Sequence, residues 1–282
     1  MPAEPVILAG VGDEAAPDLA GQLAAVARAG LDAIELRTVD GVALSDLDDH
    51  AFADVVDALE WSDTRVVCVD SRIGNWARPV TGPFELDLDE LAVLARRCAV
   101  LGCRYVRVMS YPGGGLSERD WRARVVARLR VLADRAEQAG LVLLHENCAG
   151  WAGESARRTL DLLAAVDSPA LGVLFDTGNG VAHGYAAHDM LSALVDHVAH
   201  VHVKDAVAGP RYTLPGQGWA RVADCLRLLL DNGYRGAFSL EPHLGVLPHE
   251  GMTYTPDAAA RFVEAGTALR RLVHETLVAV SR

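Results

Sequence analysis

The sequence predicts a closed (β/α)8 barrel, the TIM-barrel fold, formed by a single domain over residues 1–282. Short runs rich in β-branched residues alternate with amphipathic stretches, and the alternation is repeated eight times along the chain. Strands separated by helices of this length imply right-handed crossovers and a parallel sheet buried on both faces. An open, doubly wound sheet is the alternative, but Gly10 and Gly12 lack the third glycine of its phosphate-binding fingerprint. Eight such units therefore favour a closed barrel.

The expected strands are short apolar runs, because a parallel strand covered on both faces has little need for polar residues. We assign the eight strands to Val6–Val11, Ala33–Arg37, Arg65–Asp70, Tyr105–Ser110, Val142–Asn147, Leu171–Asp176, His200–Lys204 and Ala237–Glu241.

The expected helices are the amphipathic segments between these strands. Gly30 and Gly102 directly follow two of them, which is typical of a helix C-terminus. The stretch Asn75–Phe84 contains two prolines and looks like an inserted loop. We assign the eight helices to Asp18–Ala29, Asp46–Glu60, Asp87–Leu101, Ser117–Ala139, Ser155–Val166, His188–Val198, Trp219–Asp231 and Asp257–Val278.

Charge and composition exclude several classes of partner. The chain has 26 Lys and Arg residues against 38 Asp and Glu residues, a formal net charge of −12, which argues against nucleic acid or an anionic membrane. Half of the residues are apolar, enough for a large core. We therefore expect a compact soluble protein that acts on a small molecule.

The N-terminus and the cysteines indicate a cytoplasmic protein. Met1–Gly10 has neither a basic start nor a long apolar segment, and no apolar run of 18 residues follows. The five cysteines are scattered and form no CxxC pair, which favours reduced thiols. Cys148 lies beside the candidate site described next. We interpret it as a small buried apolar residue, with a nucleophile as the alternative.

Four consecutive strands, the fifth to the eighth, end in a side chain that can bind a metal. These residues are Glu146, Asp176, His202 and Glu241. The active site of such a barrel lies at the C-terminal ends of its strands, so inward-facing side chains there would meet. Three clustered carboxylates repel one another unless a cation or protons neutralise them. The alternative is that each residue caps a helix or is an ordinary core histidine, but four on adjacent strands favour a metal site.

The segments around these residues carry a family resemblance. HENCAGW at 145–151, LGVLFDTGN at 171–179, HVHVKD at 200–205 and FSLEPH at 238–243 resemble the sugar phosphate isomerase/epimerase superfamily of xylose isomerase-like barrels, and the resemblance covers nearly the whole chain. It implies that Glu146, Asp176, His202 and Glu241 bind one divalent metal, and that Glu146 and Glu241 face each other as the catalytic acid/base pair. An oxygen-rich set with one nitrogen suits Mn²⁺ first, with Mg²⁺, Co²⁺ or Zn²⁺ as alternatives.

The resemblance implies proton transfer next to the carbonyl of a ketose, cyclitol or related keto-sugar through a cis-enediolate. We expect a metal-dependent sugar isomerase or epimerase. The alternative is a lyase on the same barrel, either an inosose-type dehydratase or a 3-keto-C-glycoside deglycosidase. The family's dimers and tetramers make a homo-oligomer possible. A DNA-repair enzyme of the endonuclease IV type and a sugar-binding barrel without turnover are the weaker alternatives.

Three departures from the ketose 3-epimerase pattern bear on that choice. Asn179 stands where those enzymes carry a histidine after the sixth strand, and asparagine cannot act as an acid. Their arginine after the seventh-strand histidine has no match at the same spacing, so Arg211 is the nearest candidate. Their additional glutamate after the fifth strand is also out of register, with Glu154 nearest.

Six residues are candidate substrate contacts: Lys204, Arg211, Asn179, Arg37, Trp151 and His243. Lys204 shares a strand face with His202 and could neutralise an enolate, or it could pair with Asp205 or Glu35. Arg37 could donate to a substrate oxygen or form a structural ion pair. Trp151 could stack on a sugar or pack in its loop, and His243 could support Glu241 or be exposed.

Overall fold

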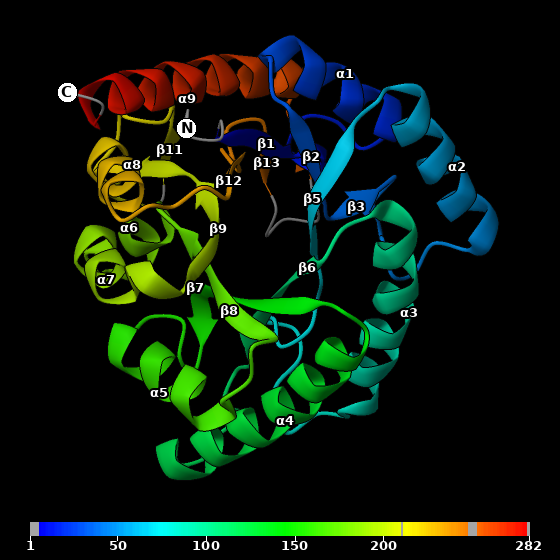
Figure 1. Cartoon of the computed structure of the whole chain (residues 1–282), viewed down its shortest axis with the longest axis vertical. Coiled ribbons are helices and arrows are strands. Elements are labelled where there is room, and N and C mark those ends of the chain that lie inside the picture. Colours follow the sequence, from blue (N-terminus) through cyan, green and yellow to red (C-terminus); the bar gives the residue numbers. More distant parts are fainter. Residues whose placement is uncertain (1–5, 210, 248–252, 281–282) are drawn as a thin grey trace.

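Eight parallel strands close into a barrel in the computed structural model, which describes residues 6–209, 211–247 and 253–280 (Figure 1). The closed order is β1-β12-β9-β8-β7-β6-β5-β2, which confirms the predicted fold class. The ends of the predicted domain, residues 1–5 and 281–282, lie outside the described residues. The strands are β1 (Ile7–Val11), β2 (Ala33–Leu36), β5 (Arg65–Asp70), β6 (Tyr105–Ser110), β7 (Val142–Gly150), β8 (Leu171–Asp176), β9 (Val198–Val203) and β12 (Ala237–Leu240).

A ring of helices surrounds the strands, and the last helix lies beside the first, which closes the ring (Figure 1). Several helices start where a side chain accepts a backbone N–H: Asp18, Asp48, Ser117 and Ser155 are such N-caps. The helices are α1 (Leu19–Ala29), α2 (Asp49–Trp61), α3 (Glu85–Leu101), α4 (Glu118–Gln138), α5 (Ala156–Val166), α7 (Ala187–Leu194), α8 (Val222–Asp231) and α9 (Ala258–Val280).

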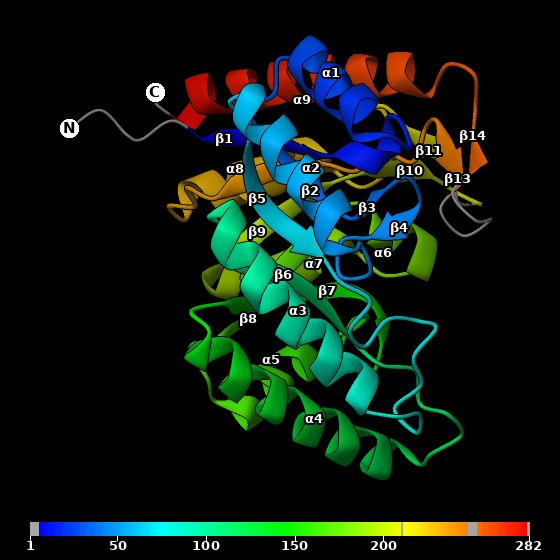
Figure 2. The ribbon, with the colours of Figure 1, turned by 90° about the vertical axis from the view of Figure 1, so that its right-hand side faces the viewer.

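The loops after the strands carry structure that the sequence did not predict. A short helix, α6 (Asn179–His183), follows β8, and three hairpins gather at one end of the barrel (Figure 2). Each hairpin has only two or three residues in a strand, too few for a period-2 pattern to be recognised. The hairpins are β3 (Thr38–Val39) with β4 (Val42–Ala43), β10 (Asp205–Val207) with β11 (Arg211–Thr213), and β13 (Val246–Leu247) with β14 (Thr253–Tyr254).

Four predicted boundaries were wrong by three or four residues. The helix predicted from Asp46 begins at Asp49, and the strand predicted to end at Asn147 continues to Gly150. The helix predicted to reach Val198 ends at Leu194, and a 3-10 turn leads into β9. The helix predicted from Trp219 begins at Val222, because the residues before it wrap around a buried carboxylate. Asp205 accepts the backbone N–H groups of Gly216, Gly218 and Ala220 at 2.9 to 3.1 Å. A Cβ on Gly218 would lie 2.2 Å from Asp205 Oδ1, so this turn requires glycine.

The main apolar core lies between the barrel and its helices. Ile34, Phe175, Phe238, Leu129 and Phe262 are among its largest fully buried side chains. The interior of the barrel, in contrast, holds buried charged residues toward the ends of the strands. Among the described helices, none is long and apolar enough to span a membrane.

Candidate metal centre and its cavity

The four strand-end residues predicted from the sequence meet inside the barrel. One ligand-type atom from each of Glu146, Asp176, His202 and Glu241 lies within 4.8 Å of the others, and all four side chains are buried. The strands that carry them are neighbours in the order β7-β8-β9-β12. The register pairs His202 with Asp176 on one side and with Ser239 on the other, so the C-terminal ends of β8, β9 and β12 lie at the same height in the barrel. We refer to these four residues as the strand-end cluster.

The donor set of the strand-end cluster fits a divalent cation. Asp176 Oδ2 and Glu241 Oε2 are buried and share one ammonium, that of Lys204, and His202 Nδ1 is buried 3.2 Å from Glu241 Oε2. Two buried carboxylates that share a single cation retain negative charge, which a bound metal ion would neutralise. Three carboxylates and one imidazole are the donors expected for Mn²⁺, Mg²⁺ or Co²⁺, and Zn²⁺ accepts the same atom types.

The charges in the barrel interior also favour a bound cation. Burial raises the pKa of Asp176, and this effect outweighs the attraction of Lys204. Burial likewise raises the pKa of Asp70 well above its ordinary value despite Arg107. Both directions show carboxyl groups with too little positive charge nearby. Within the described residues, seven buried carboxyl groups surround three permanent cations, Arg37, Arg107 and Lys204; the carboxyl groups belong to Asp13, Glu14, Glu35, Asp70, Glu146, Asp176 and Glu241.

Lys204 sits directly against the strand-end cluster. Its Nζ lies 2.9 Å from Asp176 Oδ2 and 2.8 Å from Glu241 Oε2, so it pairs with neither Asp205 nor Glu35. Lys204 is the single lysine of the chain, whose other basic residues besides histidine are arginines. A compact ammonium can approach two carboxylates in a space that a planar guanidinium would not fit.

The two glutamates of the predicted acid/base pair differ in their surroundings. Glu241 Oε1 accepts a hydrogen bond from Arg37 Nη1 at 2.8 Å, while Oε2 contacts Lys204. Although burial alone would raise the pKa of Glu241, Lys204, His243 and His202 hold it well below its ordinary value. Glu146 Oε2 accepts from Arg107 Nη1 at the longer distance of 3.2 Å.

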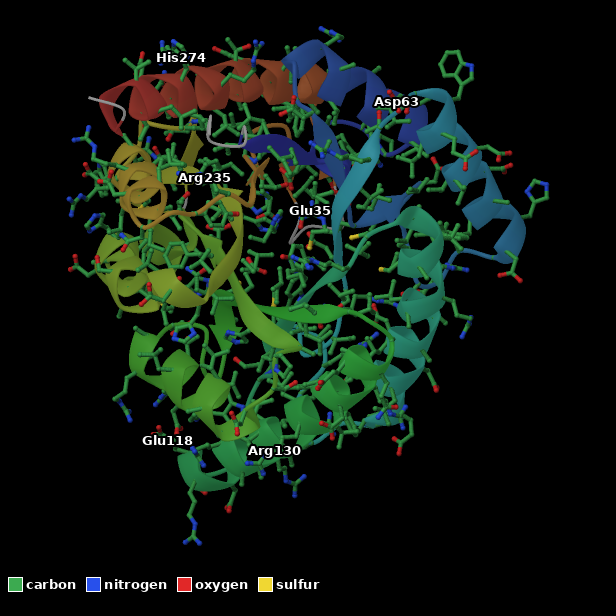
Figure 3. All side chains as sticks on the ribbon, in the orientation of Figure 1. Glu35, Asp63, Glu118, Arg130, Arg235 and His274 are labelled. Atoms are coloured by element: carbon green, nitrogen blue, oxygen red, sulfur yellow. The ribbon has the colours of Figure 1, made fainter. Side chains whose placement is uncertain are left out.

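Behind His202, a buried carboxylate holds two imidazole rings. Glu35 Oε1 lies 2.9 Å from His202 Nε2, and Glu35 Oε2 lies 2.8 Å from His200 Nε2. Although burial alone would raise the pKa of Glu35, His202 and His200 hold it well below its ordinary value. Figure 3 shows Glu35 inside the ring of strands, whereas Glu118 and His274 lie on the periphery.

A second network orients Arg37. Its guanidinium contacts Asp13, Glu14 and Glu241, at 2.9, 2.7 and 2.8 Å. Glu14 Oε1 also lies 2.9 Å from His243 Nδ1, and these contacts outweigh burial and lower the pKa of Glu14 to about 2. Arg37 is thus fixed by three carboxylates, with one of its nitrogens aimed at the strand-end cluster.

Helix α6 positions two members of the strand-end cluster. The backbone N–H groups of Gly178 and Asn179 both donate to Asp176 Oδ1 at 2.7 Å. The Asn179 side chain donates from Nδ2 to Glu146 Oε1 at 3.0 Å and accepts from Lys204 Nζ at 3.3 Å. Asn179 therefore lies in the site as predicted, between Glu146 and Lys204.

A cavity of about 540 Å³ opens above the strand-end cluster. Its volume is in the range of small-molecule sites. Of the predicted residues, six line it: Glu146, Glu241, Arg37, Asn179, Lys204 and His243.

Two predicted substrate contacts lie elsewhere. Trp151 is buried, with its ring near the guanidinium groups of Arg122 and Arg158 at 5.8 and 6.0 Å, so it packs in its loop instead of stacking on a ligand. Arg211 is exposed on β11, because side chains alternate along the hairpin and its neighbour Tyr212 faces the cavity. Neither Trp151 nor Arg211 is among the residues that line the cavity.

Several residues that line the cavity were not predicted from the sequence. Asp70 ends a predicted strand and Arg107 lies within another, and a charged residue inside an apolar run was the signal that could have identified them. Trp76 comes from the loop that was recognised as an insertion. Tyr212 and His183 lie in elements too short to be predicted.

Comparison with known proteins assigns the fold family. A family model described as a xylose isomerase-like TIM barrel matches residues 23–264. The chain belongs to the xylose isomerase-like TIM barrels. Within this family, an inosose dehydratase from Geobacillus kaustophilus is 23% identical over 215 residues, 64% of this chain and 67% of that protein.

Two solved structures of xylose isomerase-like barrels show the same fold. D-allulose 3-epimerase from Methylomonas sp., in complex with D-allulose, has a TM-score of 0.73 at 20% identity and covers 96% of this chain and 98% of its own. The IolI protein with a bound zinc atom has a TM-score of 0.69 at 19% identity, with 97% of each chain covered. At these identities the likeness shows the fold alone.

Proposed function

We propose that this chain is a divalent-metal enzyme that transfers a proton next to the carbonyl of a keto-sugar or keto-cyclitol. The observation that carries the proposal is the strand-end cluster at the floor of a cavity, with four buried ligand-type atoms within 4.8 Å of one another. The activities named for the related proteins, inosose dehydratase and D-allulose 3-epimerase, both begin by activating a C–H bond beside a carbonyl.

Glu146, Asp176, His202 and Glu241 would hold the metal. Once bound, the ion would polarise the substrate carbonyl and make the neighbouring C–H bond more acidic. Mn²⁺ remains the metal we expect first, and the zinc atom bound in IolI keeps Zn²⁺ among the alternatives.

Glu146 is the residue that we assign as the base. It lines the cavity and contacts one cation, Arg107, while Glu241 contacts Arg37, Lys204 and His202. A carboxylate held by fewer cations takes up a proton more readily. The electron pair of the broken C–H bond then moves toward the carbonyl oxygen, giving an enediolate.

Lys204 and Arg37 would stabilise the negative charge that develops on the substrate oxygens. Both side chains line the cavity, and Arg37 is held in place by the buried carboxylates of Asp13 and Glu14. A fixed cation in a buried site stabilises such charge strongly, because it needs no reorganisation during the reaction. A metal bound to Asp176 and Glu241 would release the Lys204 ammonium, which could then approach a substrate oxygen.

Two outcomes can follow from the enediolate. If Glu241 or Glu146 returns a proton to carbon, the enzyme is an isomerase or epimerase. If an oxygen on the next carbon leaves instead, the enzyme is a lyase, and the inosose dehydratase relative together with Asn179 at the histidine position favours this second candidate.

Solvent exchange tests the shared step. Protein loaded with Mn²⁺ is incubated in D₂O with an inosose and, separately, with D-allulose, and the deuterium content of the recovered sugar is measured by mass spectrometry. We expect deuterium beside the carbonyl with at least one of them, and a loss of about 10²–10⁴-fold in the exchange rate for Glu146→Gln. The exposed variant Glu137→Gln is the matched control. Exchange at the wild-type rate in Glu146→Gln would contradict the assigned base.

A further inference from the structure

His183 and Glu154 form a second acid/base pair that the proposed reaction has not yet used. We propose that His183, oriented by Glu154, gives a proton to the departing oxygen of the substrate, so that the enediolate goes on to elimination. This inference rests on the proposed function and selects one of its two outcomes.

The pair lies one step further from the barrel floor than Glu146. Along β7, Cys148 follows Glu146 toward the C-terminal end of the strand, and both side chains line the cavity. On α6, His183 follows Asn179 by four residues and thus lies on the same helix face. Asn179 contacts Glu146 at 3.0 Å, and His183 Nε2 lies 3.9 Å from Cys148 Sγ. β7 and α6 therefore contact each other at two heights: a lower height, at Glu146 and Asn179, and an upper height, at Cys148 and His183.

The upper height is open to a ligand. His183 and Cys148 line the same cavity as Lys204 and Glu146. The His183 side chain retains 27% of its exposure, so its ring is accessible from the cavity and from solvent. The same cavity is also lined by seven charged side chains besides His183: Arg37, Asp70, Arg72, Arg107, Glu146, Lys204 and Glu241.

Glu154 fixes the orientation of the ring. Its Oε1 lies 3.0 Å from His183 Nδ1, which leaves Nε2 directed toward Cys148 and the cavity. A carboxylate that contacts one ring nitrogen fixes the ring so that the other nitrogen faces a reacting group. Nε2 is therefore the nitrogen that would carry the transferred proton.

The heights match the order of atoms in an elimination. The carbon that loses its proton lies next to the carbonyl, near the strand-end cluster and Glu146. The departing oxygen is attached to the following carbon, further from the carbonyl, as His183 is further from the floor.

The proton and electron balance closes without a further reactant. Glu146 takes the proton from carbon, and the C–H electron pair forms the enediolate. The carbonyl re-forms, a carbon–carbon double bond appears, and the C–O bond breaks with its electron pair on the oxygen. His183 donates its Nε2 proton to that oxygen, which leaves as water. Glu146 then releases its proton to solvent, and His183 regains one.

The test separates proton removal from elimination. Mn²⁺-loaded protein is given an inosose in D₂O, and two rates are measured: deuterium entry into the recovered substrate, and formation of a product lighter by one water. For His183→Gln we expect elimination to fall by about 10²-fold or more, with exchange preserved within about twofold. Glu154→Gln should show the same split with a smaller loss, about tenfold.

One control variant and one test variant make the result specific. His188→Gln changes a histidine of α7 outside the cavity lining and should leave both rates unchanged. Cys148→Ser removes the thiol that faces His183 Nε2 and tests whether the thiol, instead of the imidazole, is the acting group; if His183 acts, elimination in Cys148→Ser stays well above that in His183→Gln. Loss of elimination in Cys148→Ser with activity intact in His183→Gln would overturn the proposal, since the thiol would then be the acting group.

Failure of this inference can be told from failure of the proposed function. Exchange without loss of water in the wild type, or an equal fall of exchange and elimination in His183→Gln, overturns the role of His183 alone. Absence of exchange from the wild type with every keto-sugar and keto-cyclitol tried contradicts the proposed function itself.

Discussion

His202 presents Nδ1 to the strand-end cluster because its other ring nitrogen, Nε2, lies 2.9 Å from Glu35 Oε1. An ionised carboxylate can only accept hydrogen bonds, so Glu35 keeps a proton on Nε2. Although burial alone would lower the pKa of His202, Glu35 and Glu241 raise it well above its ordinary value, so a metal bound at Nδ1, the nitrogen that faces Glu241, would replace a proton. Glu35 comes from β2, three strands away from β9 in the closed order, so the closure of the barrel brings this partner to His202.

Glu35→Gln should weaken metal binding. A glutamine presents one acceptor where Glu35 presents two, and His200 and His202 then compete for it. We expect the affinity for Mn²⁺ to fall by about 10- to 100-fold, as for other partners that orient metal-binding histidines. Isothermal titration calorimetry of metal-free protein measures this, with exposed Glu137→Gln as the control. Unchanged affinity in Glu35→Gln would show that Glu35 does not orient His202.

Lys204→Met should strengthen metal binding, the opposite of the effect expected for Glu35→Gln. The Lys204 ammonium contacts two oxygens of the strand-end cluster, so it competes with a cation for the same negative charge. Its removal should tighten Mn²⁺ binding by about tenfold or more while it lowers turnover, because the charge on the substrate is no longer stabilised.

The single lysine gives a direct measurement of that competition. Selective ¹⁵N labelling of lysine yields one side-chain signal, from Lys204. Titration with Mg²⁺ should shift this signal with saturation, as the ammonium loses its contacts to Asp176 and Glu241. A signal that stays fixed while Mg²⁺ binds would contradict the shared site.

Trp76 and Trp151 should respond differently to truncation. Trp76 lines the cavity, so Trp76→Ala should raise KM for the substrate by about 3- to 10-fold with little change in stability. Trp151 is buried, so Trp151→Ala should lower the free energy of unfolding by about 3–5 kcal/mol. Steady-state kinetics and urea unfolding of both variants check this contrast, and it would fail if Trp151→Ala changed KM alone.

Acid should destabilise the barrel partly through His145. This histidine is fully buried, neither ring nitrogen has a hydrogen bond, and burial lowers its pKa to about 4, against a smaller opposing effect of Glu146. Because the unfolded chain binds the proton more tightly, stability is lost as the pH falls from about 6.5 toward 4. The contribution is about 3 kcal/mol.

His145→Leu should therefore flatten the pH dependence of unfolding over that window. Urea unfolding at pH 7 and at pH 4.5 measures the difference, and His274→Leu, an exposed change on α9, is the control. The same acid sensitivity in wild type and His145→Leu would show that His145 does not contribute.

Much of the fold and of the strand-end cluster could be predicted from the sequence, because both depend on the eight regular repeats. Apolar runs define strands such as Leu171–Asp176, and the barrel topology then places their last residues at one end. Glu146, Asp176, His202 and Glu241 could be found together on this ground alone.

The remaining features depend on the exact path of loops and on contacts across the barrel. Trp151 and Arg211 lie away from the cavity, and Tyr212 lines it, because β11 and the loop after β7 were not predicted. Glu35 contacts His202 across the interior of the barrel. The two residues are 167 positions apart, so no local sequence pattern contains this contact. The facing pair of Cys148 and His183 arises only because α6 turns back over β7.

The central claim is that the strand-end cluster binds one divalent ion, which the proton transfer requires. The measurement that tests it most directly is the titration of metal-free protein with Mn²⁺, following bound ion by electron paramagnetic resonance and deuterium entry into a substrate keto-sugar in the same samples. We predict that exchange rises in proportion to bound Mn²⁺ and levels off at one ion per chain, and that Asp176→Asn abolishes both responses. Full exchange in the metal-free protein, or unchanged tight binding in Asp176→Asn, would contradict the account.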